Sequence, residues 1–478
     1  MIKRLLFMLC AAAILLLAAC GEIAVDTFDD ALDDTLDKPT EIIEYSLDDL
    51  LDFALVRREG IIKPNREALL PLTQGRTPGD LPSALRNNNQ HQIVSLDEAI
   101  ADVHIFFEAL YNSYAGYVYF GGNEVFLPVK DAIIVDLIAL GYTVHHFRFE
   151  TILNNHLSPI INDRHFYLGS THTTTFGRTM NYFNTPILAY DRTANGFVNR
   201  ATGEYLYSID AIDGRRYDID EILRLHVNAN GELLYRPVIL SEINTGSFEV
   251  VFTYENGDVS IRRFARWTSN WRQIQYPSLR FIYDIPVVTV MTMGFIGRDN
   301  ARHATDFLGF AQELIHEPAI IIDVRGNIGG NGELGVEWFN KFLGTNVPTN
   351  FVGLNTFGRN FENNHGISQN LTDRIVPSEQ LFIILTDRHT SSAGEWFVDL
   401  TFNMTNTLVI GHATAGILAF SGTFEDLRLP NSGIAFGFGE VMYIWPEGHF
   451  TENAGIQPDI WVQGDALTAA LALLRNLR

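Results

Sequence analysis

The strongest candidate nucleophile is a serine placed after a predicted buried strand. Residues 390–395 read Thr-Ser-Ser-Ala-Gly-Glu, follow the apolar run Leu381–Leu385 and open a predicted helix. A hydroxyl at such a junction lies near backbone N–H groups and the positive end of a helix dipole, which suits attack on a carbonyl through an oxyanion. Ser392 followed three residues later by Glu395 is also a capping box, so the local sequence leaves a helix cap as the alternative.

A glycine-rich segment lies between a predicted strand and a predicted helix. Residues 323–332 read Asp-Val-Arg-Gly-Asn-Ile-Gly-Gly-Asn-Gly, and glycines let backbone N–H groups approach and point at a ligand. Gly330, Gly332 and Gly335 also satisfy G-x-G-x-x-G, the spacing of dinucleotide sites. The only acid in residues 336–361 is Glu337, inside the predicted helix. An oxyanion-binding turn is therefore the better functional interpretation, and a tight strand-to-helix turn is the alternative.

The metal-ligating residue types do not assemble into a site. Cys10 and Cys20 are the only cysteines, and both lie in the first twenty residues. The adjacent pair His145-His146 has diverging side chains, and no H-E-x-x-H is present. The sequence therefore predicts no metal and no other cofactor. His389, His412 and His449 follow the glycine-rich segment in the chain and are fallback candidates for a general base.

The composition is that of a globular protein with several domains. The chain has 478 residues, of which 46% are hydrophobic and 19% charged, and its formal net charge is −23 at pH 7. This acidity argues against a general affinity for nucleic acid or anionic lipid.

The N-terminus predicts export. Lys3 and Arg4 precede an apolar stretch, and Leu17-Ala18-Ala19-Cys20 resembles the lipobox of bacterial lipoproteins. That resemblance implies a signal peptide over residues 1–19 and lipidation of Cys20. The alternative is a short uncleaved signal anchor. The protein is expected to be attached to a membrane of the cell envelope, facing the periplasm or the cell exterior.

The rest of the chain changes in pattern from region to region. Residues 20–92 predict an acidic tether and an extended wrap, with helical turns around Leu47–Val56 as an alternative. Residues 93–180 predict a helical region, 181–265 a β-rich module and 266–478 an α/β domain. The α/β prediction rests on strand-like runs that alternate with helical stretches. Expected strands cover Val287–Met293, Ala319–Val324, Leu381–Leu385 and Leu408–Ile410. Expected helices cover Ser95–Tyr111, Val129–Leu140, Arg302–Ile315, Gly332–Leu343 and Ala393–Met404.

Four segments in this order resemble the tail-specific and tricorn-core serine peptidase superfamily. They are Ile320–Gly330, Ser392–Glu395, Val409–Gly416 and Glu452–Ile460. The first is similar to D-L-R-x-N-x-G-G, the second carries the family's serine before A-x-E, and the last is similar to E-N-x-G-(V/I)-x-P-D-I. The clear match covers about residues 280–465, and residues 95–170 resemble more weakly the helical region of tricorn-like members. The resemblance implies a crotonase-like core of ββα units.

Site roles follow from this resemblance position by position. Ser392 corresponds to the nucleophile, with Ser391 as its nearest rival. The backbone N–H groups of Gly329 or Gly330 and of Ala393 correspond to the oxyanion hole. The lysine base of the C-terminal processing branch is missing, because Thr414-Ala415-Gly416 is followed by Ile417 and the last lysine is Lys341.

The tricorn-like branch uses a histidine instead. Asp163-Arg164-His165 resembles its D-x-H segment, which makes His165 the candidate base and Glu452 the residue that orients or polarises it. Arg164 stands where the tricorn core has serine, so the fourth catalytic group is unassigned.

The prediction is an exported serine peptidase that cleaves peptides or unfolded proteins through an acyl-enzyme. Relatives often carry a PDZ domain where this chain has its β-rich module, but no G-L-G-F-like carboxylate loop is evident there. The first alternative is an inactive peptide-binding or scaffold lipoprotein with the same fold. The second is a solute-binding lipoprotein, which gives no account of the four ordered motifs.

Overall fold

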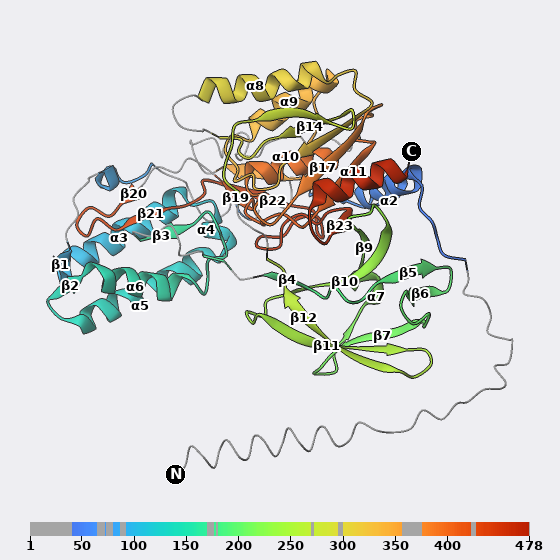
Figure 1. Ribbon diagram of the computed structural model, residues 1–478. Helices are drawn as coiled ribbons and strands as arrows, with labels where there is room; N and C mark the ends of the chain where they lie inside the picture. Colours follow the sequence, from blue (N-terminus) through green and yellow to red (C-terminus); the bar gives the residue numbers. More distant parts are fainter. Residues whose placement is uncertain are drawn as a thin grey trace, which may run out of the picture. The chain divides into compact units, whose positions relative to one another are not determined.

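The computed structural model describes residues 41–64, 72, 80–86, 92–169, 176–177, 180–268, 272–294, 300–355, 375–421 and 427–477. The chain divides into residues 1–41 and 42–478, and the labelled elements in Figure 1 all belong to the second unit. The predicted signal peptide and Cys20 lie outside the described residues.

Five parallel strands lie side by side in the main sheet. They are β14 (Ile285–Thr289), β15 (Ala319–Asp323), β17 (Leu381–Thr386), β18 (Thr407–Gly411) and β23 (Ile460–Val462). An antiparallel strand, β13 (Ser278–Ile282), pairs with β14. Parallel strands that are covered on both faces have continuous apolar sequences. This explains sequences such as Ala-Ile-Ile-Ile in β15.

Alternate residues of these strands pack into two different hydrophobic clusters. Ile320 and Ile322 belong to the cluster of three helices, α8 (Asn300–Glu313), α9 (Glu333–Leu343) and α10 (Ala393–Thr401). Ile321 belongs to the cluster of α11 (Ala466–Asn476) and α2 (Leu47–Glu59). Because successive side chains of a strand point to opposite faces, the two sets of helices cover opposite faces of the sheet (Figure 1).

Helix α2 is fixed to the core by a buried arginine. The Nη2 atom of Arg58 donates to Thr407 O at 2.6 Å and lies 2.9 Å from Asp459 Oδ2. Arg57 Nη2 donates to Gln457 O at 2.8 Å. Part of the region expected to be a tether or wrap is therefore an ordered helix that contacts the core.

The β-rich stretch continues the main sheet. It contains one short helix, α7 (Ile219–Ile222). Its strands are β4 (Asn181–Asn184), β5 (Tyr190–Thr193), β6 (Gly196–Asn199), β7 (Leu206–Ala211), β8 (Arg216–Tyr217), β9 (Leu223–Val227), β10 (Leu233–Ser241), β11 (Ser247–Tyr254) and β12 (Val259–Arg266). Strand β9 pairs in parallel with β23, so hydrogen bonds run without a break from this stretch into the α/β core.

The helical region before it packs around a hydrophobic cluster that also includes residues of the C-terminal part of the chain, such as Phe420 and Phe436. It comprises η2 (Ser83–Arg86), β1 (Ile93–Ser95), α3 (Leu96–Ser113), α4 (Gly116–Tyr119), α5 (Gly122–Leu140), β2 (Thr143–His145) and α6 (His146–Leu157). Ser95 and Glu98 form the capping box of α3, with Glu98 N–H to Ser95 Oγ at 3.3 Å.

Two small sheets are built mainly from the later part of the chain. One contains β3 (Tyr167–Leu168), β20 (Leu427–Arg428) and β21 (Ala435–Gly437); the other contains β16 (Val352–Asn355), β19 (Phe420–Ser421) and β22 (Val441–Ile444). Strand β3 pairs with β21, so the segment after α6 lies beside residues from the C-terminal part of the chain.

The predicted α/β class is confirmed, with differences at the ends of elements. The strand expected to reach Met293 ends at Thr289, because the Met293 N–H bonds instead to Gly329 O at 2.7 Å. The helix expected to reach Met404 ends at Thr401, where hydrogen bonds from Phe402 N–H to Asp399 O and from Asn403 N–H to Leu400 O tighten the last turn.

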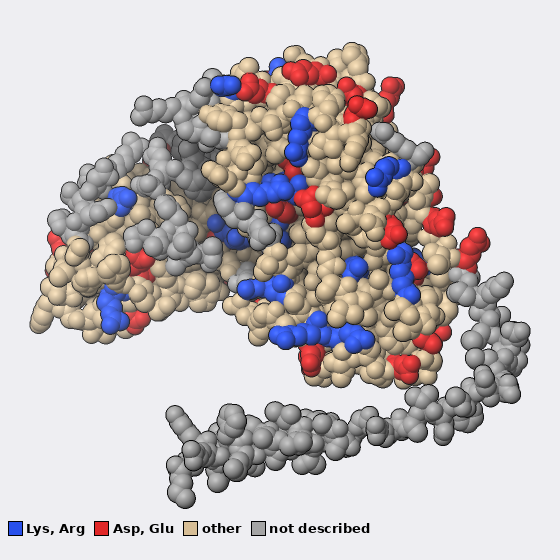
Figure 2. Space-filling view, in the orientation of Figure 1, with Lys and Arg blue, Asp and Glu red and all other residues tan. Residues whose placement is uncertain are grey.

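In the described part of the chain, no helix combines the length and apolarity needed to cross a membrane. The face shown in Figure 2 carries acidic and basic side chains next to one another, with wide areas that carry neither.

Candidate active site

Ser392 occupies a strained turn between β17 and α10. Its backbone has φ 52° and ψ −121°, a region that favours glycine and is costly for a residue with a side chain. Residues in such conformations cost about 1–3 kcal/mol and cluster at functional sites. Among the described residues few others outside glycine have positive φ. The turn therefore distinguishes Ser392 from an ordinary helix cap.

The predicted glycine turn lies directly against this serine. A Cβ added to Gly329 would lie 2.7 Å from Ser392 Cβ and 3.2 Å from Ala393 N. Gly329 and Gly330 both have positive φ, at 93° and 133°. Glycine is therefore required at position 329 for two reasons, the backbone conformation and the close approach to Ser392.

The buried side chain of Asn327 shapes the turn. Its Nδ2 donates to Val290 O and its Oδ1 accepts the Gly329 N–H, both at 2.9 Å. The Gly329 N–H is thus already bonded. The N–H groups of Gly330 and Ala393, by contrast, donate to no acceptor among the described residues. Of the predicted oxyanion-hole groups, these two are available to a substrate.

The structure brings His165 to Ser392 across 227 residues of sequence. His165 Nε2 lies 3.3 Å from Ser392 Oγ, at the outer limit of a hydrogen bond. Burial, and secondarily the positive charge of Arg164, lower the pKa of His165 to about 4. The imidazole is therefore neutral at neutral pH and able to accept a proton.

Two buried carboxyl groups hold the segment that carries His165. Asp163 Oδ1 accepts the His165 N–H at 2.7 Å, and Glu452 Oε1 accepts the Arg164 N–H at 3.0 Å. Burial raises the pKa of Asp163 to about 7. Burial, together with the charge of Asp163, raises the pKa of Glu452 to about 8. Glu452 thus acts on the backbone next to His165.

Glu395 connects the serine to the following motif. Its Oε2 accepts the Ser392 N–H at 3.0 Å and the Ile417 N–H at 2.7 Å. Its Oε1 accepts Thr414 Oγ1 at 2.6 Å and the Gly416 N–H at 2.7 Å. The carboxylate half of the predicted capping box is therefore present, and the same group fixes the T-x-G segment.

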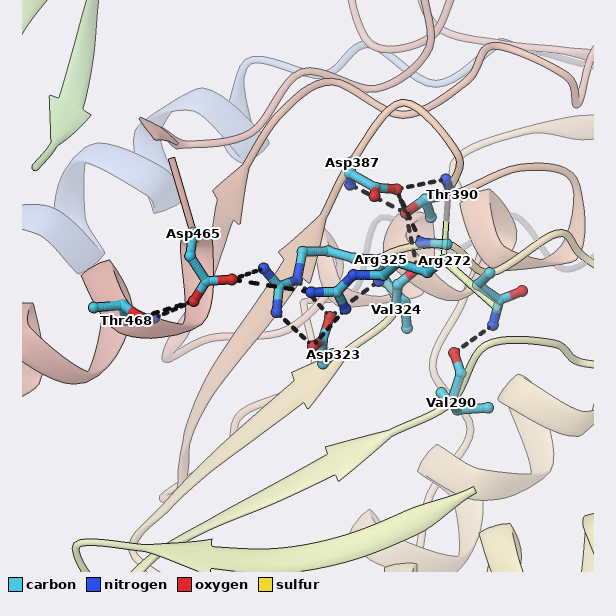
Figure 3. Close-up of polar contacts among 11 residues, drawn as sticks. Arg272, Val290, Asp323, Val324, Arg325, Asp387, Thr390, Asp465 and Thr468 are labelled. Atoms are coloured by element: carbon cyan, nitrogen blue, oxygen red, sulfur yellow. Dashed lines mark hydrogen bonds and ion pairs between the residues drawn. The ribbon is translucent and has the colours of Figure 1, made fainter. Parts of the chain in front are cut away.

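A polar network anchors the start of the glycine turn, as Figure 3 shows. Asp323 pairs with Arg325, whose Nη1 also donates to Asp465 at 2.9 Å. Asp387 Oδ1 accepts the Gly326 N–H at 2.9 Å, and Thr390 Oγ1 donates to Val324 O at 2.8 Å. These contacts tie the turn after β15 to the segment between β17 and Ser392.

The fallback histidines have other contacts. His449 Nε2 lies 2.8 Å from Asp399 Oδ1 in the core, and His412 Nε2 bonds to Val462 O at 2.8 Å. The backbone N–H of His389 donates to Asp387 Oδ1 at 3.0 Å. His146 lies 3.4 Å from Glu150. The described residues contain no group of three or more His, Cys, Asp or Glu side chains suited to a metal.

Sequence reasoning gave no role to Asp163, Asn327 or Arg164. The first two had a usable signal, because an Asp or Asn side chain often accepts the backbone N–H two residues later. Both do so here, toward His165 and Gly329. Arg164 Nη1 donates to Ala415 O at 2.9 Å, a contact between distant segments that no local pattern could indicate.

The chain is similar to a known peptidase family and to several solved structures. A model of peptidase family S41 matches residues 285–462. No curated protein matches the chain. Similar solved structures include the photosystem II D1 C-terminal processing protease, with 13% identity over 79% of this chain and 97% of that chain and a TM-score of 0.39. A putative peptidase from Parabacteroides merdae has 14% identity over 80% and 97% of the chains and a TM-score of 0.39. A lipoprotein from Streptococcus agalactiae has 20% identity over 42% and 70% of the chains and a TM-score of 0.31.

The family model spans Gly329, Gly330, Ser392, Ala393 and Glu452, and it ends short of the segment that carries His165. The match agrees with the resemblance drawn from the four ordered motifs. Residues 285–462 of this chain are therefore similar to peptidase family S41.

Proposed function

We propose that this protein is an active serine peptidase in which Ser392 is the nucleophile and His165 the general base. The observation that carries the proposal is the 3.3 Å approach of His165 Nε2 to the Oγ of a serine held at positive φ. A helix cap requires neither the histidine nor the strain. The paired geometry of nucleophile and base is the recognised signature of this chemistry.

The reaction proceeds in two halves. Ser392 Oγ attacks the peptide carbonyl carbon while its proton passes to His165 Nε2, and the oxyanion accepts hydrogen bonds from the Gly330 and Ala393 N–H groups. His165 then gives the proton to the leaving amine as the C–N bond breaks. Water then attacks the acyl carbon while its proton passes to His165. The ester C–O bond breaks, and His165 returns the proton to Ser392 Oγ as the acid leaves.

Glu452 has a positioning role in this proposal. It accepts the Arg164 N–H with one oxygen and the N–H groups of Leu418 and Ala419 with the other, at 3.3 and 2.9 Å. These bonds hold the backbone beside His165 against the segment after the T-x-G motif. Asp163 supports the same residue from within its own loop.

The test is hydrolysis of casein by the purified mature protein. Wild type should cleave it, and Ser392→Ala should reduce kcat by about 10⁴-fold or more. Ser391→Ala is the matched control, because the Ser391 Oγ lies 3.5 Å from Asn327 O rather than at His165. Equal activity of wild type and Ser392→Ala would refute the assignment. Absence of cleavage across several unfolded substrates would favour a binding protein that keeps the fold.

The proposed location is the outer face of a cell-envelope membrane, with a lipid on Cys20. The support is the signal-like sequence before Cys20 and the acidic stretch after it. Incorporation of labelled palmitate by wild type and not by Cys20→Ser would support the anchor. Labelling of both proteins would contradict it.

A further inference from the structure

A mainly apolar cavity of about 320 Å³ lies beside the candidate active site. Its apolar wall includes Phe420, Met442, Ile444, Trp445 and Phe450. Phe420, Met442 and Phe450 are almost fully buried. Ligand pockets in proteins measure about 300–1,000 Å³, so this cavity is at the small end of that range. The size suits one large side chain rather than a whole cofactor.

The polar members of the wall link the cavity to the catalytic groups. Asn162 lies three residues before His165, and Glu452 accepts the Arg164 N–H. Ala419 donates its N–H to Glu452 and lies two residues after Ile417, whose N–H bonds to Glu395. Glu395 in turn holds the Ser392 N–H. The segment that carries His165 and the segment that carries Ser392 are therefore each connected to the wall of the cavity through one or two hydrogen bonds.

The charge of the cavity favours an uncharged occupant. Among the residues of its lining that the structure describes, Glu452 is the only Asp, Glu, Lys or Arg. Both of its oxygens already accept backbone N–H groups, and burial raises its pKa. An ammonium or carboxylate side chain entering this space would lose its hydration and gain no free partner of opposite charge, which is costly.

We infer that this cavity is a specificity subsite that accepts an aliphatic or aromatic side chain of the substrate, next to the bond attacked by Ser392. The inference rests on the proposed function, because the occupant is a side chain of the peptide being cleaved. A subsite of this kind discriminates strongly against charge and more weakly between apolar side chains, by about 10–200-fold for a methylene group.

The first test is cleavage of a peptide library in which one position at a time is varied around a fixed sequence. The wild type should favour Leu, Met or Phe over Asp and Lys by at least tenfold in kcat/KM at one position adjacent to the cleaved bond. Ile444→Phe, which adds volume at a partly buried wall residue, should reduce cleavage of the Phe peptide at least tenfold relative to the Ala peptide.

Ile261→Phe is the matched control, because Ile261 is 55% exposed on β12 and does not line the cavity. It should leave the ranking of the peptides unchanged. An unchanged ranking in folded Ile444→Phe, or a wild type indifferent to charge at every position, would overturn the inference.

Binding of the same peptides to Ser392→Ala separates the two proposals. If wild type cleaves nothing but Ser392→Ala binds apolar peptides at least tenfold more tightly than charged ones, the subsite stands and the proposed peptidase activity fails. If wild type cleaves without preference, the activity stands and the subsite fails.

Discussion

The serine side and the histidine side of the proposed active site are held in place by different kinds of contact. Ser392 lies between a strand and a helix of the α/β core, and Glu395, which binds its N–H, is three residues away. His165 follows α6 in the helical region. Its loop is held by contacts from Arg164 to Ala415 and Glu452, which are 251 and 288 residues distant in sequence.

This difference explains what each side requires. The serine depends on a local strand–turn–helix pattern and lies inside the region matched by the family model. The histidine depends on two parts of the chain folding against each other. Catalysis by such a pair should therefore be lost through substitutions within the α/β core on the serine side, and through substitutions that separate the two parts of the chain on the histidine side.

The largest effect tests whether the two sides act as one unit. His165→Ala and Ser392→Ala should each lower kcat by about 10⁴-fold or more, and the double variant should be no worse than either single variant. The measurement is single-turnover peptide hydrolysis. His156→Ala is the control, because His156 pairs with Asp136 in an exposed position. Additive losses in the double variant would show that the two residues act independently.

The next largest effect comes from a substitution that disturbs the serine side alone. Gly329→Ala should lower kcat about 100-fold or more, because the added methyl group would lie 2.7 Å from Ser392 Cβ and must displace the nucleophile. Gly344→Ala separates contact from backbone strain. Gly344 also has positive φ, at 66°, but its Cβ would meet nothing within 4 Å. Equal losses of kcat in both variants would contradict the steric explanation.

The pKa of His165, on the histidine side, determines how kcat/KM responds to acid. Because burial lowers the pKa of His165 to about 4, the base stays neutral in mildly acidic solution. At pH 5.5 the protein should keep most of its kcat/KM, whereas a histidine with an ordinary pKa of about 6.5 would leave about a tenth of it. The measurement is kcat/KM from pH 4 to 8. A fall centred between pH 6 and 7 would contradict the buried, neutral base.

The smallest effect concerns Glu452, which holds the backbone beside His165, and its influence on the free energy of unfolding. Burial raises the pKa of Glu452 from 4.5 to about 8, so between these values the native state keeps a proton that the unfolded chain loses. The stabilisation is therefore full below pH 4.5 and is lost as the pH rises through 8. One such proton changes the free energy of unfolding by at most about 1.4 kcal/mol per pH unit.

Glu452→Gln should flatten this dependence between pH 5 and 8. The measurement is thermal unfolding of both proteins over that range, with the exposed Glu447→Gln as the control. If the stabilities of wild type and Glu452→Gln change in parallel with pH, Glu452 does not carry the proton.

The sequence predicted those parts of the site that depend on local pattern. The strand before Ser392, the helix after it and the glycine turn follow from runs of apolar residues and from glycine, and the structure has all three. Burial of β15, with Ile320 to Ile322 essentially inaccessible, follows from the same reasoning. Such elements are determined mainly by neighbours in sequence.

What the sequence could not predict depends on distant contacts. Nothing local indicates that β9 pairs with β23, or that Arg164 reaches Ala415. The availability of the Gly330 N–H instead of the Gly329 N–H depends on the side-chain orientation of Asn327. The positive φ of Ser392 is a property of the packed turn, because serine by itself does not favour it.

The strained backbone at Ser392 has a consequence for stability. A glycine at this position would relieve the unfavourable φ and ψ, so Ser392→Gly should be more stable than Ser392→Ala. The position that suits the proposed nucleophile is therefore one where a side chain lowers the stability of the folded protein, and a more stable variant at this position would lack the hydroxyl.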